Sequence, residues 1–161
     1  MTARDIEVAV AKHFDYRRNL IVPNTYWGIG LNHEADLLIL SDAGYATEVE
    51  IKISRADLLR DKAKAHEHES GIVKAFWFAV PEALAEFALA NIPEEAGLLV
   101  VRDLKPSQIS YHNPKVKIVR AAALRRSSRK FTEAERYQLA RLGLMRYWTL
   151  RHDVFEDRIS I

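Results

Sequence analysis

The chain has 161 residues, 48% of them hydrophobic, which is enough for one substantial core, so we expect a single domain spanning residues 1–161. It contains no cysteine, which excludes disulfides and thiolate-bound metals and favours hard cations such as Mg²⁺ or Mn²⁺ on oxygen ligands. Asp5 and Glu7 interrupt the N-terminal apolar run, and no apolar stretch approaches the roughly 20 residues of a membrane span, so the sequence predicts a cytoplasmic protein with no membrane segment.

The first part of the chain predicts a helix, an edge strand and a β-hairpin. Residues 3–14 have the apolar spacing of a short buried helix, with Thr2 as its N-cap. Residues 19–31 are rich in β-branched and aromatic side chains, but Pro23 and Gly28 indicate an edge strand or a bulge. The hairpin follows as the strand ADLLIL, a turn that contains Gly44, and the strand YATEVEIKI.

Helices and strands then alternate. Ser54 opens a capping box for a helix that runs toward Glu69. Residues 73–80 and 97–101 are continuous apolar runs typical of buried central strands, and Pro81 is expected at a helix start. Further short extended pieces are expected after these runs, including an edge strand at 116–119. This order predicts a three-layer α/β domain with a central mixed β-sheet flanked by helices.

The sequence TEAE, which begins at Thr132, is a second capping box and opens a long terminal helix. Four apolar residues recur along one stripe of this helix: Leu139, Leu142, Met145 and Trp148. Such a stripe is as compatible with a face that docks a partner helix as with core, and its burial distinguishes the two. Four aromatic residues are expected in the core rather than as base-stacking groups: Trp27, Tyr111, Tyr147 and Trp148.

The net charge of +2 conceals two segments of opposite sign. Residues 33–69 contain nine acidic residues against five Lys or Arg, whereas residues 102–131 contain nine basic residues against one acidic residue, a difference of +8. An enzyme that acts on a polyanion needs carboxylates for a metal and a basic surface for phosphates. A solvated surface with segregated charges is the alternative. We expect nucleic acid to bind six residues of the basic segment: Lys115, Lys117, Arg125, Arg126, Arg129 and Lys130.

Three residues of the hairpin form the candidate site. Alternation along a strand places Glu50 and Lys52 on one face. If the loop is the three residues 42–44, paired positions sum to 86 and Asp36 lies opposite Glu50 (36 + 50 = 86); a two-residue turn would place Asp36 opposite Val49 instead. Opposed Cβ atoms lie about 4.5–5.5 Å apart, so the two carboxylates would share a divalent cation. Lys52 would then donate to a phosphate oxygen or orient the attacking water.

Glu-x-Lys on an exposed strand is common and by itself indicates only an exposed surface pair without a function. Asp36 changes this interpretation, because it begins a strand of Leu and Ile where a carboxylate requires a partner or an ion. Glu48 shares the face of Glu50 and either enlarges the acidic cluster or faces solvent.

Asp36 followed fourteen positions later by Glu50-Ile51-Lys52 (50 − 36 = 14) resembles the signature of the PD-(D/E)XK nuclease superfamily. The segments VEIKISRADLLRDK, FWFAVPE and GLLVV resemble the MmcB-like DNA-repair endonucleases of that superfamily, over about residues 33–105. Ala35 stands where the name of the superfamily has proline, at a position that varies widely.

This resemblance implies a restriction-endonuclease-like domain that hydrolyses DNA with Mg²⁺ or Mn²⁺, with Asp36 and Glu50 as metal ligands and Lys52 assisting catalysis. It also implies an acid from the first helix, for which Glu7 is the candidate and Asp5 competes. Lys62 and Lys64 either contact phosphate or offset neighbouring acids, and the resemblance slightly favours Lys62 as an accessory phosphate contact. The main alternative is a non-catalytic nucleic-acid-binding module on the same fold. A scaffold protein that docks a partner through its terminal helix is a third possibility.

Overall fold

The computed structural model describes residues 1–26, 28–62, 71–110 and 112–159, without the side chains of 61–62 and 155–159. Six strands, four α-helices and two short 3₁₀ helices lie in this part of the chain. In chain order they are α1 (Ala3–His13), β1 (Leu20–Thr25), β2 (Ala35–Leu40), β3 (Ala46–Ile51), α2 (Arg55–Lys62), β4 (Val73–Pro81), η1 (Glu82–Leu84), α3 (Ala85–Asn91), β5 (Gly97–Val101), η2 (Pro106–Gln108), β6 (Val116–Arg120) and α4 (Glu133–Ile159).

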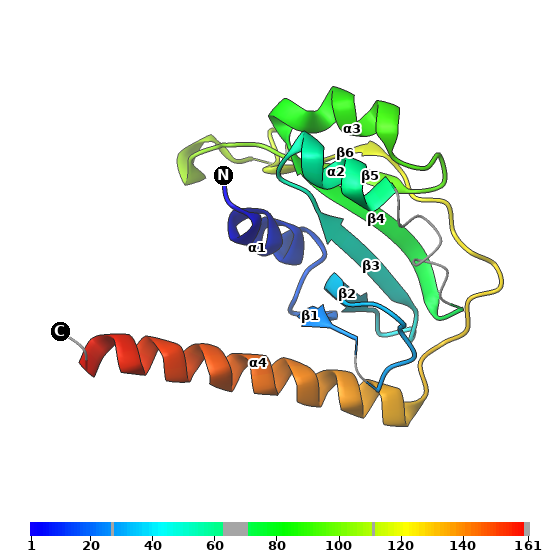
Figure 1. Ribbon diagram of the computed structural model, residues 1–161, viewed down its shortest axis with the longest axis vertical. Coiled ribbons are helices and arrows are strands. Elements are labelled where there is room, and N and C mark those ends of the chain that lie inside the picture. Colours follow the sequence, from blue (N-terminus) through cyan, green and yellow to red (C-terminus); the bar gives the residue numbers. More distant parts are fainter. Residues whose placement is uncertain (27, 63–70, 111, 160–161) are drawn as a thin grey trace.

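The strands form one mixed sheet in the order β1-β2-β3-β4-β5-β6 (Figure 1). The first three strands are an antiparallel meander, β3, β4 and β5 are parallel, and β6 returns antiparallel to β5. The three parallel strands end on one side of the sheet, which we call the carboxyl edge. We call the opposite side, where these strands begin, the amino edge. Because β2 runs against β3, β2 begins at the carboxyl edge.

Both faces of the sheet are buried, and each has its own apolar core. One core joins α1 to the sheet through Ile6, Ala9, Val10, Leu37, Val49 and Leu99. The other joins α2, α3 and α4 to the opposite face through Leu58, Ala88, Leu139, Leu38, Phe76 and Leu98. Helices therefore cover both faces of a mixed sheet, which confirms the predicted three-layer α/β architecture.

Three of the predicted helix starts are confirmed. Thr2 caps α1 in a reciprocal capping box with Asp5, and Thr132 does the same for α4 with Glu135. The hydroxyl of Ser54 accepts a hydrogen bond from the backbone of Asp57 at the start of α2. Each cap satisfies backbone donors that the first turn of a helix leaves unpaired.

Two boundaries differ from the prediction. The strand expected over residues 19–31 ends at Thr25, after Asn24 takes a positive φ of 48°. The helix expected to start at Pro81 starts later, because Pro81 is still the last residue of β4 and η1 precedes α3. The helix expected to run toward Glu69 is described only as far as Lys62.

The burial of the stripe along α4 shows that only its first half is core. Leu139 is fully buried and Leu142 is half-buried, but Met145 is 55% and Trp148 61% exposed. Tyr147, also expected in the core, is 51% exposed, and Trp27 and Tyr111 lie outside the described residues. A helix of 27 residues is about 40 Å long, whereas the six residues of β1, beneath it, extend about 20 Å. The last turns of α4 therefore continue beyond the sheet (Figure 1).

The position of the Trp77 ring against Gly97 predicts an effect of substitution at this glycine. A Cβ atom at this position would lie 2.2 Å from the Trp77 ring, which is opposite Gly97 in the strand register. We expect Gly97→Ala to lower the free energy of unfolding by about 1–3 kcal/mol in urea denaturation, because the ring must leave its contacts with the α1 core. Gly71→Ala is the control, since no described atom lies within 4 Å of its Cβ position. Equal losses of stability in both variants would contradict the clash.

Candidate functional site

The hairpin turn brings Asp36 and Glu50 together. Ser41 and Tyr45 are joined by a backbone hydrogen bond of 3.0 Å, and Gly44 takes a positive φ of 87° between them. The register of β2 and β3 runs from Leu40 opposite Ala46 to Leu37 opposite Val49, and every pair sums to 86. The predicted three-residue loop is therefore confirmed, and the next pair in this register is Asp36 with Glu50.

Asp36 lies at the carboxyl edge, where β2 begins. Its side chain is half-buried, and one carboxylate oxygen, Oδ2, accepts a hydrogen bond of 2.8 Å from the backbone N–H of Ile51. The Asp36 side chain thus bridges the ends of two strands. This bond fixes the direction of the carboxylate while the described residues give Oδ1 no hydrogen bond.

Glu50 and Lys52 form a buried ion pair next to Asp36. Glu50 is 5% and Lys52 8% exposed, and Lys52 Nζ donates to Glu50 Oε2 at 2.8 Å. The backbone of Lys52 continues the pairing of β3 with β4, because its N–H donates to the carbonyl oxygen of Ala79 at 3.0 Å. The other oxygen of Glu50, Oε1, is buried and has no hydrogen-bond partner among the described residues. The interpretation of Glu-x-Lys as an exposed surface pair is therefore wrong.

The environment of Glu50 disfavours its charged form. Burial and then the negative charge of Asp36 raise the pKa of Glu50 to about 7, against the opposing effect of Lys52. Glu48 adds a smaller effect in the same direction.

Glu7, rather than Asp5, is the acid of the first helix that lies near this site. Glu7 is half-buried, and its pKa is raised by burial and, against the effect of Arg4, by the charge of Asp36. Asp5 is exposed and serves the capping box with Thr2. The structure thus favours the first of the two candidates.

Glu48 is fully buried, so the alternative that it faces solvent is wrong. Its Oε1 lies 2.6 Å from Nε2 of His33, and Nδ1 of His33 lies 2.8 Å from the side-chain oxygen of Asn32. His33 was not predicted from the sequence, because it lies in a loop without periodicity and its contact spans fifteen positions. The pair anchors this loop to the buried row of Glu48 and Glu50.

The last accessory candidate, Lys62, is the final residue of α2, and its side chain lies outside the described part of the structure.

Asp36 and Glu50 fit a hard divalent cation. No group of three or more His, Asp or Glu suited to a metal is found among the described residues. Mg²⁺, however, commonly binds one or two protein carboxylates and completes its coordination with water and substrate phosphate. The buried Oε1 of Glu50 is the acceptor that such a cation would satisfy.

The six basic residues predicted to bind nucleic acid do not form one surface. Lys115 lies at the carboxyl edge, where its carbonyl oxygen accepts from the N–H of Arg102 at 2.9 Å, and Lys117 is exposed on β6. The other four lie in a segment that crosses the amino edge through backbone hydrogen bonds to Glu95, Lys74, Gly71 and Gly44: Arg125, Arg126, Arg129 and Lys130. About 20 Å separates the two edges along the six residues of β3.

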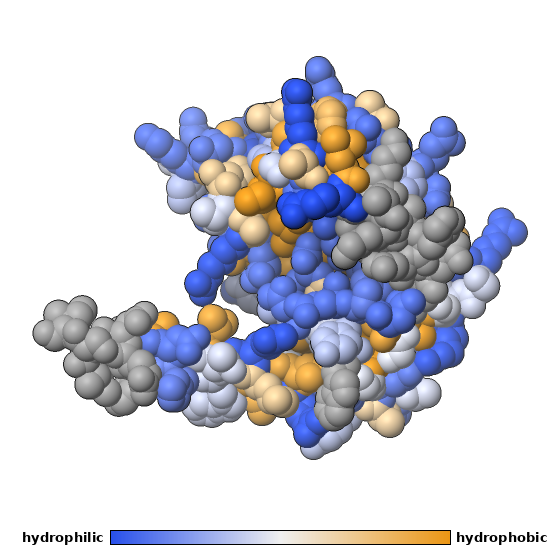
Figure 2. Space-filling model, viewed as in Figure 1, coloured by the Kyte–Doolittle hydropathy of each residue, from blue (hydrophilic) through white to orange (hydrophobic). Residues whose placement is uncertain are grey.

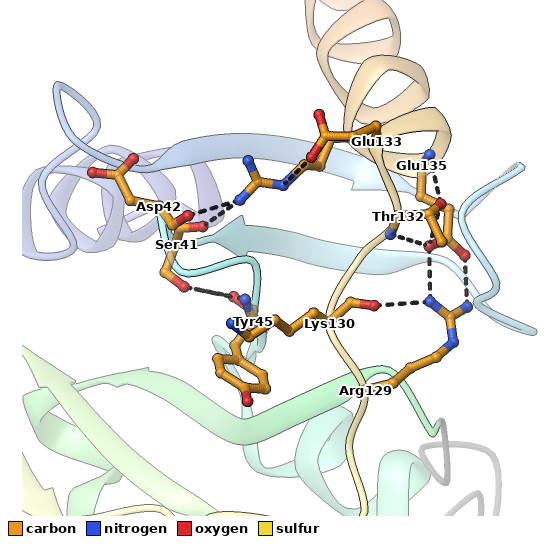
Figure 3. A network of polar contacts seen from close by, with 9 residues as sticks. Ser41, Asp42, Tyr45, Arg129, Lys130, Thr132, Glu133 and Glu135 are labelled. Carbon is orange, nitrogen blue, oxygen red and sulfur yellow. Dashed lines mark hydrogen bonds and ion pairs between the residues drawn. The ribbon is translucent and has the colours of Figure 1, made fainter.

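Part of this segment has a structural role at the start of α4 (Figure 3). Arg129 donates to both carboxylate oxygens of Glu135, at 2.8 and 2.6 Å, and this pairing lowers the pKa of Glu135 to about 2. Lys130 Nζ lies 5.3 Å from the centroid of the Tyr45 ring. These two side chains fasten the segment to the hairpin and to α4.

Comparison with known proteins supports the fold but indicates no activity. No family model matches the chain, and no curated protein matches it. Among solved structures, it is similar to a protein of unknown function from Silicibacter pomeroyi, with 22% identity, 97% of this chain and 92% of that chain covered, and a TM-score of 0.60. None of the helices in the described residues has the length and hydrophobicity to cross a membrane.

The raised pKa of Glu50 predicts how stability depends on pH without metal. Between the unfolded pKa of 4.5 and the folded pKa of about 7, the unfolded chain has released the proton that the folded chain still binds. Stability should therefore fall by roughly 1–3 kcal/mol as the pH rises across this range and stay level above it. In urea denaturation with a chelator present, Glu50→Gln should abolish this fall. An unchanged pH profile in the variant would show that Glu50 is not its source.

Proposed function

We propose that the protein is a Mg²⁺- or Mn²⁺-dependent nuclease that hydrolyses DNA phosphodiester bonds, acting in DNA repair or processing in the cytoplasm. The observation that carries this proposal is the convergence of Asp36, Glu50 and Lys52 at the carboxyl edge, with a buried carboxylate oxygen that lacks a partner among the described residues. The resemblance of these three residues to the PD-(D/E)XK signature, on a fold with a three-layer architecture, supports the same interpretation.

Each residue has a distinct task in this proposal. Asp36 and Glu50 would hold the cation, with Glu7 placed to add negative charge from α1. When bound, the cation lowers the pKa of a water molecule and offsets the charge of the phosphate. Lys52 cannot bind a cation, so its ammonium group acts on the phosphate oxygens or on the water. Hydrolysis adds this water to phosphorus and breaks one P–O bond, leaving a phosphate monoester and a hydroxyl.

A nucleic-acid-binding module without turnover is the second candidate. It is favoured by the pairing of Lys52 with Glu50. Measurements of metal binding and of DNA cleavage distinguish the nuclease from the binding module.

The first test of the proposed function is metal binding. Asp36→Asn and Glu50→Gln should each weaken Mg²⁺ or Mn²⁺ binding at least about tenfold in titration calorimetry, because both remove a charged ligand. Circular dichroism should show an unchanged fold. If both variants bind the cation as the parent does, these residues are not its ligands.

The second test separates chemistry from binding at Lys52. Lys52→Met keeps the aliphatic stem and removes the charge, so the cleavage rate of DNA with Mg²⁺ should fall by about 10²-fold or more while metal affinity changes little. Lys74→Met is the control, because Lys74 lies near the amino edge, where its ammonium group is 4.6 Å from the Tyr45 ring centroid. Cleavage by Lys52→Met at the parental rate would remove this residue from the mechanism. No cleavage by the parent would favour the binding module.

The third test of the proposed function uses the division of the basic residues between the two edges of the sheet. Replacing Arg125 and Arg126 with Gln should weaken DNA binding and reduce its salt dependence by about 0.9 in log–log slope for each phosphate that the variant no longer neutralises. The cleavage rate with saturating DNA should not change, because these residues lie about 20 Å from the site along β3. An unchanged salt slope would exclude the amino edge from DNA binding.

A further inference from the structure

A groove lies between the end of β1 and the second half of α4. One wall consists of Asn24, Thr25 and Tyr26, and the other includes Met145, Arg146 and Thr149. Its volume is about 200 Å³, below the roughly 300 Å³ at which pockets for whole small ligands begin. The groove thus has room for one small planar group and its substituents.

The groove adjoins the candidate site. Thr25 is paired with Ala35 across the β1–β2 ladder, and Ala35 is the residue before Asp36. Neighbouring strands lie about 4.8 Å apart, so the groove begins within one strand spacing of the residues that flank Asp36. Arg146 fixes α4 at this point, because its guanidinium donates to the carbonyl oxygen of Asn24.

The polar groups of the groove suit an anionic ligand that also accepts hydrogen bonds. Thr25 is 3% exposed, and its hydroxyl has no hydrogen-bond partner among the described residues. A buried hydroxyl without a partner costs stability unless a ligand satisfies it. Arg146 is exposed and makes one described hydrogen bond, so further N–H donors remain for a phosphate. No carboxylate is among the described residues that line the groove.

The helix above the groove has the composition of a nucleic-acid surface. From Arg136 to His152 it contains four arginines and no acidic residue. Tyr147 and Trp148 are 51% and 61% exposed, and Tyr26 on the facing wall is 48% exposed. Figure 2 shows this part of α4 projecting from the body, with hydrophobic groups among hydrophilic ones. Exposed aromatic rings between arginines are suited to stack bases and to bind the backbone.

Antiparallel self-association through the outer stripe of α4 would be unfavourable. The stripe contains Tyr137, Arg141, Leu144, Trp148 and Arg151, at alternating spacings of four and three. If two copies paired antiparallel about a point between Leu144 and Trp148, Arg141 of one copy would face Arg151 of the other, twice. Like charges at such positions are repulsive, whereas a polyanion satisfies both.

We propose that this groove binds an unpaired nucleotide of the DNA strand that is cut, next to the scissile phosphate. The inference rests on the proposed function and adds a substrate class: DNA with a single-stranded segment at the cleavage point. The base lies between Tyr26 and Met145, Thr25 donates its hydroxyl proton to an acceptor of the nucleotide, and Arg146 contacts the phosphate. Two paired bases would not fit in the volume of the groove.

The experiment measures fluorescence anisotropy of a labelled single-stranded oligothymidylate, and of a blunt duplex, with the full chain in the Lys52→Met background. Met145→Glu places a carboxylate in the groove and should weaken binding of the single strand at least about tenfold. Leu144→Glu is the matched control, because this neighbour is similarly exposed, 57% against 55%, and does not line the groove. Its effect should stay below about threefold.

Thr25→Val provides a second measurement that does not depend on charge. It should weaken binding of the single strand by about three- to tenfold, the effect of one hydrogen bond, while the melting temperature stays equal or rises because a buried hydroxyl without a partner is removed. A hydroxyl with a purely structural role would leave binding unchanged.

Four further results would overturn the proposal. They are no binding of the single strand, equal reductions of affinity in Met145→Glu and Leu144→Glu, equal reductions for single strand and duplex, or a dimer in sedimentation analysis that Met145→Glu dissociates. The last result would assign the groove to a second copy of the chain. Because binding is measured without cleavage, weaker strand binding in the groove variants supports the groove even if the parent cuts no DNA.

Discussion

The register between β2 and β3 is the constraint on which the candidate site depends. The loop of residues 42–44, with Gly44 at a positive φ, sets this register and brings Asp36 opposite Glu50. A slip of one residue would pair Asp36 with Val49, whose side chain lies in the α1 core. The carboxylate would then lie among apolar side chains on the other face. A single turn thus decides whether the two acids meet.

The charges that this register brings together are costly to bury. Glu48 and Glu50 project from one face of β3, whose neighbouring strands contribute Leu38 and Phe76 to an apolar core. The ion pair with Lys52 offsets part of the cost for Glu50, yet a buried ion pair is often no more stable than apolar side chains of similar size. Stability alone does not explain this row of charges, which agrees with the metal site that we propose. The same reasoning gives weight to the carboxylate oxygen of Glu50 that lacks a partner among the described residues.

Local interactions made much of this fold predictable from the sequence. Thr2 and Thr132 begin helices as expected, because each cap is complete within three residues, and the hairpin follows from its turn. Prediction failed where the outcome depends on distant parts. The spacing of Met145 and Trp148 shows that they share a stripe but not that the sheet ends beneath them. The contact of His33 with β3 likewise depends on the tertiary path of a loop.

The anchor of α4 lies at the amino edge of the sheet, whereas the candidate site lies at the carboxyl edge. The segment before α4 crosses the amino edge, where Phe131 donates to Gly44 and Arg129 pairs with Glu135, so the helix is anchored beside the hairpin turn that sets the register. From this anchor α4 runs along β1 toward the carboxyl edge, and it is longer than the strand beneath it. Its free turns must therefore emerge on the side where Asp36 lies. The length of the helix and the position of its anchor therefore carry its exposed aromatic and basic side chains past the end of β1, on the side of the sheet that also holds the candidate site.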